Sequence, residues 1–363
     1  MKIRHGAQKL SKAVFCHLLT ILKNGGQMIF NTIKKIAILI CLLLTITGCF
    51  SHKEPVGVNV TVSAIEKKWD TVRVSTAMSW VDYNATMDTR SEVDFANGSI
   101  KIEAVLPAKT DRLKQVSEKK IASQVKKIFQ TETALKSSIL KDQVKNANGE
   151  IVSSSNVKKF VKHLTPKFVK KVYIDRNGVR RIKTSVKVKM VRNHINIRAR
   201  QYAKIVTSYA RKFGITPHLV LAIIHRESRF NPLAVSPGGA LGLMQLIPRY
   251  GGKDAYKYIY KKNKIMHKNY FYDPQKNIEL GVAYYYLLKH RYFDSIKNNT
   301  KKRYLSICAY NTGPTRIKRL VPLDTAKQLN APQLYTFLKK KTPPETCNYL
   351  KSVTHLSKKY AKW

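Results

Sequence analysis

The sequence predicts an α+β N-terminal domain followed by an all-α domain. Strand and helix signals are mixed up to about residue 194, and strand signals disappear from Ile195 onward. The chain has 363 residues, which is enough for two domains. Hydrophobic residues make up 44% of it, so a sizeable core is available and a disordered chain is disfavoured.

Residues 1–48 are predicted to be a signal peptide. Lys34 and Lys35 form a basic start, and the apolar run over 36–44 that follows is too short to span a bilayer. The residues before Met28 fit no signal, which indicates an over-long start with Met28 as the true first residue. The chain is therefore expected to be exported.

The signal ends in Ile46-Thr47-Gly48-Cys49, which resembles a bacterial lipobox. The resemblance implies that Cys49 is acylated and becomes the mature N-terminus; the alternative is an ordinary signal peptide with an incidental cysteine. Phe50 stands where lipoproteins kept in the inner membrane carry Asp, so we expect an outer-membrane lipoprotein facing the periplasm. The polar residues over 49–76 are predicted to be a tether.

The predicted α+β domain covers residues 77–194. Apolar residues alternate on both sides of Asn97-Gly98, which is typical of a hairpin with a tight turn. A helical pattern runs over 111–146. A second hairpin is predicted at Asn177-Gly178, with a return strand over 185–191. We find no catalytic constellation in this domain.

The predicted all-α domain covers residues 195–363. Its first helix closes at Gly214, and Thr216-Pro217 begins the next, with Thr as N-cap and Pro at the first helical position. Glu227 shares the apolar face of that helix, where partial burial would raise its pKa and suit it to general acid catalysis. The alternative is a glutamate that extends from the helix end into solvent.

Four motifs in order place this half of the chain in a family. Glu227-Ser228-Arg229-Phe230-Asn231-Pro232, Gly242-Leu243-Met244-Gln245, Ala309-Tyr310-Asn311-Thr312-Gly313 and "PPETCNYLKSV" resemble the motifs of lytic transglycosylases with a goose-lysozyme-like fold. "GGKDAY", "FYDPQKNI" and "WVDYNATMDTRSEVDFANGSIKIEAVLP" are similar to the membrane-bound lytic murein transglycosylase C type, lipoproteins with a domain before the catalytic one. The resemblance is weaker before Ile195.

The resemblance implies a lyase that cleaves the MurNAc–GlcNAc β-1,4 bond of peptidoglycan without water. Most glycosidases pair two carboxylates, but none follows Glu227 until Asp254. Glu227 would therefore protonate the leaving oxygen while the substrate acetamide attacks C1. It would then take the proton of the C6 hydroxyl and leave a 1,6-anhydro end.

The same resemblance implies a set of substrate-binding residues. Ser236 would orient the acetamide, Met244 and Gln245 would line the groove, and Tyr310 would place its hydroxyl near Glu227. Asn311 could fix the turn before Gly313 instead, Tyr349 could stack on a sugar or only pack, and Ser228 could bond within its helix. The set is Ser228, Ser236, Met244, Gln245, Tyr310, Asn311 and Tyr349.

The cysteines indicate neither a zinc site nor a disulfide framework. The chain has five, with no CxxC and no His/Cys zinc spacing, so we expect no metal and no cofactor. Cys308 and Cys347 each stand two residues before a motif tyrosine. They could pair in the periplasm if those tyrosines converge; a buried free cysteine is the alternative.

The formal net charge of +47 predicts a polyanionic partner, although compositional drift toward lysine would also produce it. We expect the partners to be peptidoglycan glycan strands and, through Cys49, a lipid bilayer, with the protein a monomer. Nucleic acid is disfavoured because no recognition motif is present and the chain is exported. Two rivals remain: a goose-type lysozyme that uses water, and a wall-binding lipoprotein without activity.

Overall fold

The structure is a computed structural model that describes residues 62–363. All the described residues belong to one compact unit. The predicted signal peptide, the lipobox at Cys49 and most of the predicted tether lie outside the described residues. No helix between residues 62 and 363 is long and apolar enough to cross a membrane.

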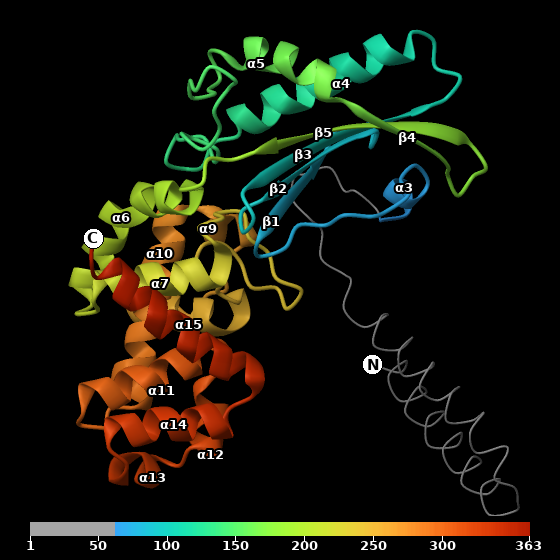
Figure 1. Ribbon diagram of the computed structural model, residues 1–363. Coiled ribbons are helices and arrows are strands. Elements are labelled where there is room, and N and C mark those ends of the chain that lie inside the picture. Colours follow the sequence, from blue (N-terminus) through green and yellow to red (C-terminus); the bar gives the residue numbers. More distant parts are fainter. Residues whose placement is uncertain (1–61) are drawn as a thin grey trace, which may run out of the picture. The chain divides into compact units, whose positions relative to one another are not determined.

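An antiparallel five-stranded sheet forms the first part, in the order β1-β2-β3-β5-β4 (Figure 1). Both predicted hairpins are present, with Gly98 and Gly178 at positive φ (65° and 76°) in their turns, a conformation that favours glycine. The elements are α3 (Val62–Glu66), β1 (Ser79–Tyr83), β2 (Thr89–Asp94), β3 (Ser99–Pro107), β4 (Val169–Ile174) and β5 (Arg180–Lys189).

Helices α4 (Leu113–Gln130) and α5 (Val157–Leu164), followed by the short η1 (Thr165–Lys167), cover one face of the sheet (Figure 1). Alternate residues of β3, such as Ile100 and Ile102, are buried against the apolar stripe of α4. Trp69 packs with Val105 in a smaller cluster beside α3.

The helix predicted over 111–146 is too long. It ends at Gln130, and Thr131 takes an extended conformation. The hydroxyl groups of Thr133 and Ser138 then accept hydrogen bonds from the backbone N–H groups of Leu135 and Leu140. Such local bonds compete with the helix ladder, which explains why residues 131–156 form turns despite helical spacing of apolar residues.

The second part is helical, as predicted, and between Lys189 and Trp363 the described chain has only isolated β-bridges. Gly214 follows the first helix at φ 62°, and Thr216 and Pro217 begin the next as expected. The elements are α6 (His194–Lys212), α7 (Pro217–Ser228), η2 (Pro248–Gly252), α8 (Lys253–Tyr260), α9 (Lys268–Tyr272), α10 (Pro274–Leu287), η3 (Leu288–Tyr292), α11 (Asn299–Thr312), α12 (Pro314–Leu320), α13 (Leu323–Gln328), α14 (Ala331–Lys341) and α15 (Pro344–Tyr360).

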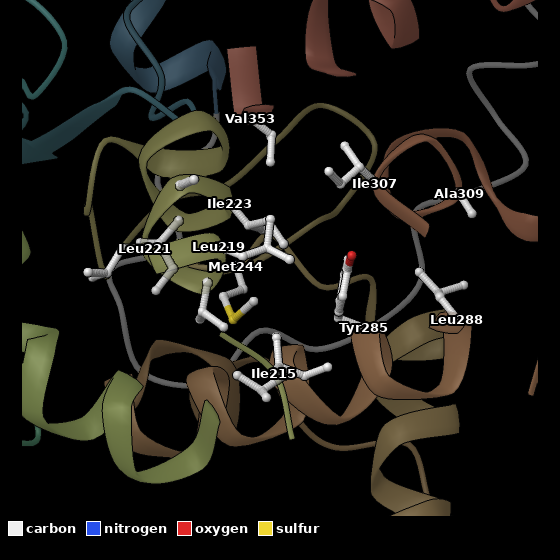
Figure 2. Close-up of a cluster of buried hydrophobic side chains, with 14 of the residues drawn as sticks. Ile215, Leu219, Leu221, Ile223, Met244, Tyr285, Leu288, Ile307, Ala309 and Val353 are labelled. Atoms are coloured by element: carbon white, nitrogen blue, oxygen red, sulfur yellow. The ribbon is translucent and has the colours of Figure 1, made fainter. Parts of the chain in front are cut away.

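Helix α7 lies at the centre of the helical core. Every residue from Leu219 to His225 is buried, so the helix is apolar nearly all round rather than along one stripe. Figure 2 shows Leu219 and Ile223 of α7 among side chains from distant helices, including Tyr285 and Ile307. A central helix of this kind has little freedom to move, which fixes the position of its last turn.

One buried guanidinium connects the sheet to the end of α7. Arg198 on α6 donates hydrogen bonds to the carbonyl of Phe95 (2.7 Å), to the side-chain oxygen of Gln143, and to the carbonyl of Arg229 (3.0 Å). Burial lowers the pKa of Arg198 to about 9, since no carboxylate is hydrogen-bonded to it. These acceptors, together with Nδ1 of His194 at 3.1 Å, hold the guanidinium in place without an ion pair to any described residue.

Candidate active site

The last turn of α7 places Glu227 at the edge of the helical core. The chain then turns sharply, because Arg229 and Phe230 both take left-handed conformations (φ 53° and 62°) that non-glycine residues rarely adopt. Phe230 is fully buried, stacked on Tyr202 and edge-on to Tyr360. This packing holds the strained turn, so the helix ends at a defined point just after Glu227.

Glu227 is partly buried and has one hydrogen-bond partner within the described residues. The hydroxyl of Tyr349 on α15 donates to its Oε1 at 2.6 Å. Burial raises the pKa of Glu227 to about 7, and the nearby Glu345 adds to the increase; the bond from Tyr349 and the charge of Arg226 act in the opposite direction. A carboxyl group with this pKa can both give and take a proton near neutral pH.

Two tyrosines flank the carboxyl group. Tyr349 is 2% exposed, and Tyr310 on α11 donates its hydroxyl proton to the carbonyl of Met244 at 2.8 Å. Burial, and after it the charge of Glu227, raises the pKa of both phenols well above the usual value. Both therefore remain protonated donors beside Glu227. The stacking role considered for Tyr349 is not what its position favours.

The Gly242-Leu243-Met244-Gln245 segment is a tight turn held by Asn277 of α10. The Asn277 amide donates to the carbonyls of Leu241 and Phe271 (both 2.9 Å) and accepts from the backbone N–H of Met244 (2.8 Å). Gly242 has φ 72°, and a Cβ on it would lie 2.2 Å from the Phe271 carbonyl oxygen. The sequence analysis did not select Asn277, although it belongs to "FYDPQKNI".

Gln245 ends this turn with an unused acceptor. Its side-chain nitrogen donates to the carbonyl of Gly242 at 3.0 Å, and its backbone has φ 48°. Its Oε1 is buried and has no hydrogen-bond partner within residues 62–363. Because a buried acceptor without a donor is costly, this oxygen is a candidate for binding a ligand N–H or O–H group.

Two of the expected substrate-binding side chains are used internally. The Ser228 hydroxyl donates toward the carbonyls of Ile224 (3.2 Å) and Leu243 (2.8 Å), joining α7 to the Gly242 turn. The Met244 side chain is 0% exposed and packs on Gly281, so it belongs to the core and does not line a groove (Figure 2). Only the Met244 carbonyl faces the site. The Ser228 bond to Ile224 is the bond within its helix that was considered from the sequence, whereas the buried Met244 side chain does not fit the groove-lining role.

Ser236 keeps a hydroxyl proton available. The residue is half-buried in the loop after Pro232, and its Oγ accepts a hydrogen bond from the backbone N–H of Ala240 at 3.0 Å. Hydroxyl groups donate as well as accept, so the Ser236 O–H can still donate to a ligand. No contact between Ser236 and Glu227 is present.

Asn311 joins the ends of two helices beside the site. Its side-chain oxygen accepts from Thr346 at 2.8 Å, and its nitrogen donates to Glu345 at 3.4 Å, both on the first turn of α15. Asn311 therefore has a structural role, but between two helices rather than in the turn before Gly313 that was considered from the sequence. Glu345 is exposed and acts on Glu227 through its charge; the sequence analysis missed it because the two are far apart in the chain.

The cysteines and histidine near the site take no part in it. Cys308 and Cys347 are free thiols, so the pairing considered from the sequence is absent. Burial raises the pKa of Cys308 to about 12, which keeps it unreactive. His225 is buried with its Nδ1 2.7 Å from the hydroxyl of Tyr360, and burial lowers its pKa to about 3.

Two family models match successive stretches of the chain. Residues 204–331 match the transglycosylase SLT domain, and residues 57–201 match the N-terminal domain of membrane-bound lytic murein transglycosylase C. The membrane-bound lytic murein transglycosylase C of Actinobacillus succinogenes is 32% identical over 301 residues, covering 80% of this chain and 83% of that protein. The protein of the same name from Haemophilus influenzae strain Rd is 30% identical over 333 residues, covering 87% and 88%.

Two solved structures are also similar to part of the chain. The 70 kDa soluble lytic transglycosylase of Escherichia coli is 26% identical, with a TM-score of 0.38; it covers 44% of this chain and 24% of that one. An inactive mutant of the lytic transglycosylase Slt from Pseudomonas aeruginosa is 25% identical, with a TM-score of 0.37 and the same coverage.

Proposed function

The chain belongs to the membrane-bound lytic murein transglycosylase C family, and we propose that Glu227 is the single acid and base of its reaction. It is a membrane-associated lyase that acts on peptidoglycan. One observation carries the proposed mechanism: Glu227 has a pKa of about 7 and is bound by a tyrosine hydroxyl, with no carboxylate or cation bonded to it in the described chain.

In the first step, protonated Glu227 gives its proton to the oxygen that joins MurNAc to GlcNAc. The bond from that oxygen to C1 of MurNAc breaks, and the carbonyl oxygen of the MurNAc 2-acetamido group bonds to C1 from the other face. The product is an oxazolinium ion, and GlcNAc leaves as an alcohol. Burial raises the pKa of Glu227 and supplies the protonated form that this step requires.

In the second step, Glu227 is a carboxylate and takes the proton of the C6 hydroxyl of the same MurNAc. The O6 atom bonds to C1, and the bond between C1 and the acetamide oxygen breaks. The glycan then ends in 1,6-anhydro-MurNAc, no water is consumed, and Glu227 is protonated again. A pKa near neutrality suits both steps, since neither proton transfer is strongly uphill.

The neighbours of Glu227 have separate proposed roles. Tyr349 donates to Glu227 and stabilises the carboxylate between the two steps. The Tyr310 hydroxyl donates its proton to the Met244 carbonyl, and its oxygen is left to accept a hydrogen bond from the reacting sugar. Gln245 offers its unpaired Oε1 to a sugar amide or hydroxyl, and Ser236 donates its O–H to the acetamide carbonyl.

We further propose that acylated Cys49 holds the protein on the periplasmic face of the outer membrane, as a monomer that acts on glycan strands. The membrane association of the family supports an anchor, and the lipobox-like Ile46-Thr47-Gly48-Cys49 supplies one. Radiolabelled palmitate should be incorporated into the wild-type protein and not into Cys49→Ala. Equal incorporation into both would contradict the assignment of the acylated residue.

Product analysis on purified sacculi tests the mechanism. Mass spectrometry should find glycan ends that are one water lighter than reducing ends, and Glu227→Gln should release none while remaining folded. Reducing ends would instead indicate a goose-type lysozyme that uses water. Lytic activity unchanged in Glu227→Gln would indicate that the centre lies elsewhere.

A further inference from the structure

The β4–β5 hairpin carries an apolar and basic surface that the proposed reaction does not use. Four of the ten large apolar side chains that are exposed in the described chain lie in this one hairpin. We call Val169, Val172, Ile174 and Val179, together with the basic residues over 167–183, the hairpin surface. The apolar members are 66%, 48%, 71% and 38% exposed, respectively.

The position of β4 at the edge of the sheet explains this exposure. Only β5 pairs with β4, and side chains alternate between the two faces of a strand, so Val169 lies on one face and Val172 and Ile174 on the other. Natural edge strands of this kind are usually covered or made polar. An exposed apolar edge therefore indicates a surface that binds a partner.

The charge of the hairpin surface narrows the kind of partner. Residues 167–183 contain seven basic side chains and one acidic one, Asp175. Asp175 is buried and paired with Arg181 at 2.5 Å. Lys167, Lys170 and Arg180 have no ion-pair partner within residues 62–363. Apolar side chains flanked by free cations fit an anionic lipid surface.

The hairpin also contacts α3, the first described helix after the proposed anchor in the sequence. The side chain of Arg176 in its turn is 2.8 Å from that of Glu66 in α3, and the Tyr173 hydroxyl donates to the carbonyl of Lys68. Figure 1 shows α3 beside the hairpin. Thirteen residue steps separate Cys49 from Val62, a reach of at most about 45 Å.

We propose that the hairpin surface docks on the anionic lipid leaflet that holds the anchor. The proposal rests on the proposed acylation of Cys49 for its proximity to lipid, and on the hairpin surface for the contact itself. Acyl chains alone would hold the protein without orienting it; a second contact fixes which side faces the membrane. A second copy of the chain is a poorer occupant, because pairing two β4 edges would bring together two surfaces that are both strongly basic.

The test uses the full acylated chain in vesicles and a tryptophan substitution at an exposed position of the hairpin. Ile174→Trp is compared with Ile265→Trp, which is 48% exposed on the helical part of the chain. The vesicles are either phosphatidylethanolamine with phosphatidylglycerol or phosphatidylcholine alone, and each kind is prepared with and without brominated acyl chains. The emission of the parent protein is subtracted, because it already contains Trp69, Trp80 and Trp363.

Interfacial apolar residues lie roughly 5–10 Å deep in the headgroup boundary. In anionic vesicles the emission maximum of the tryptophan in Ile174→Trp should therefore shift to shorter wavelength, and brominated acyl chains should quench about half of its fluorescence. Ile265→Trp should lose none, and high salt or phosphatidylcholine should reduce the loss for Ile174→Trp. Docking would be overturned if bromine did not quench the added tryptophan of Ile174→Trp in vesicle-bound protein. It would also be overturned if quenching in phosphatidylcholine vesicles equalled that in anionic vesicles. A blue shift that disappears on dilution, without loss to bromine, would show a second copy instead.

Palmitate content, measured in the same preparation, separates this proposal from the proposed anchor. Protein without palmitate would overturn the anchor. Protein that carries palmitate but whose introduced tryptophan is not quenched by bromine would overturn docking and leave the proposed anchor unaffected. Peptidoglycan cleavage by Ile174→Trp should equal that of the parent on soluble glycan strands, since the substitution lies outside the proposed active site.

Discussion

Two glutamates in this molecule are buried in opposite ways. Glu103 in β3 is 1% exposed, with Arg90 at 2.6 Å and Lys101 at 2.8 Å. Burial by itself would raise the pKa of Glu103, but these two cations more than offset it, and the pKa lies below the usual value. Among the described residues, only a tyrosine hydroxyl is hydrogen-bonded to Glu227 on α7, and burial raises its pKa to about 7.

The difference separates a structural carboxylate from a reactive one. A carboxylate with bonded cations stays charged over the whole neutral range, so it holds its neighbours in place and cannot exchange a proton. A carboxyl group bound only by a neutral donor keeps both of its protonation states accessible. Burial alone therefore does not distinguish an active-site acid from a structural carboxylate. What distinguishes them is whether a cation is bonded to the carboxyl group.

The largest expected effect comes from replacing each of the two glutamates with glutamine. Glu227→Gln should lower the rate of peptidoglycan cleavage by roughly 10²–10⁴-fold, because it removes the proton donor, while its thermal midpoint stays close to that of wild type. Glu103→Gln should leave Arg90 buried without its carboxylate and lower the stability, but the protein that stays folded should keep its activity. Turnover on sacculi and thermal melting measure the pair. Similar losses of activity in both variants would show that the distinction is wrong.

Removing the cation of the structural pair should cost stability rather than activity. Arg90→Met removes the buried partner of Glu103 and leaves only the partly exposed Lys101 beside it, which should lower the free energy of unfolding by up to about 3–5 kcal/mol. Arg73→Met is the matched control: its pair with Glu92 spans 4.0 Å at the surface, so its loss should cost under about 1 kcal/mol. Urea unfolding curves give both values, and equal losses would contradict the prediction.

Removing the one donor to Glu227 should shift the pH dependence of the reaction. Tyr349 stabilises the charged form of Glu227, so Tyr349→Phe should raise its pKa. A hydrogen bond to a charged group is worth about 1.5–3 kcal/mol and one pKa unit about 1.4 kcal/mol, so the alkaline limb of the pH–rate profile should move up by about one to two units. Tyr360→Phe, which removes the bond to His225 on the same helix, should leave the limb in place.

The smallest expected effect comes from the cation nearest to Glu227. Arg226 lies over the ring of Tyr349, 5.6 Å from its centroid, and its charge lowers the pKa of Glu227. Arg226→Met should therefore raise that pKa, by about half a unit or less, since partly exposed charges interact weakly. The alkaline limb should move in the same direction as in Tyr349→Phe. Lys351→Met, exposed on α15, is the control and should not move it.

Several local features of the fold could be predicted because each depends on residues that are adjacent in the sequence. Asn97-Gly98 and Asn177-Gly178 form hairpin turns, since glycine takes the positive φ that the turn requires. Thr216 and Pro217 begin α7. The helix predicted over 111–146 failed after Gln130, where hydroxyl side chains bond to their own backbone and override the apolar period.

The site was predicted as a set of residues rather than as a set of contacts. Ordered motifs selected Glu227, Gln245, Tyr310 and Tyr349, because their residue types match a known chemistry. The motifs did not indicate that Tyr349 binds Glu227, that the Met244 side chain is core, or that Ser228 bonds to Leu243. Each of these depends on which helix packs against which.

The sequence by itself determined the two-part architecture, the family and the identity of the proposed acid, because local turn chemistry, apolar periodicity and motif spacing are written in consecutive residues. Only the tertiary structure decided the protonation behaviour of Glu227. Its pKa depends on burial by α15 and on the hydroxyl and the distant charges that packing places around it, and no spacing along the chain specifies those distances.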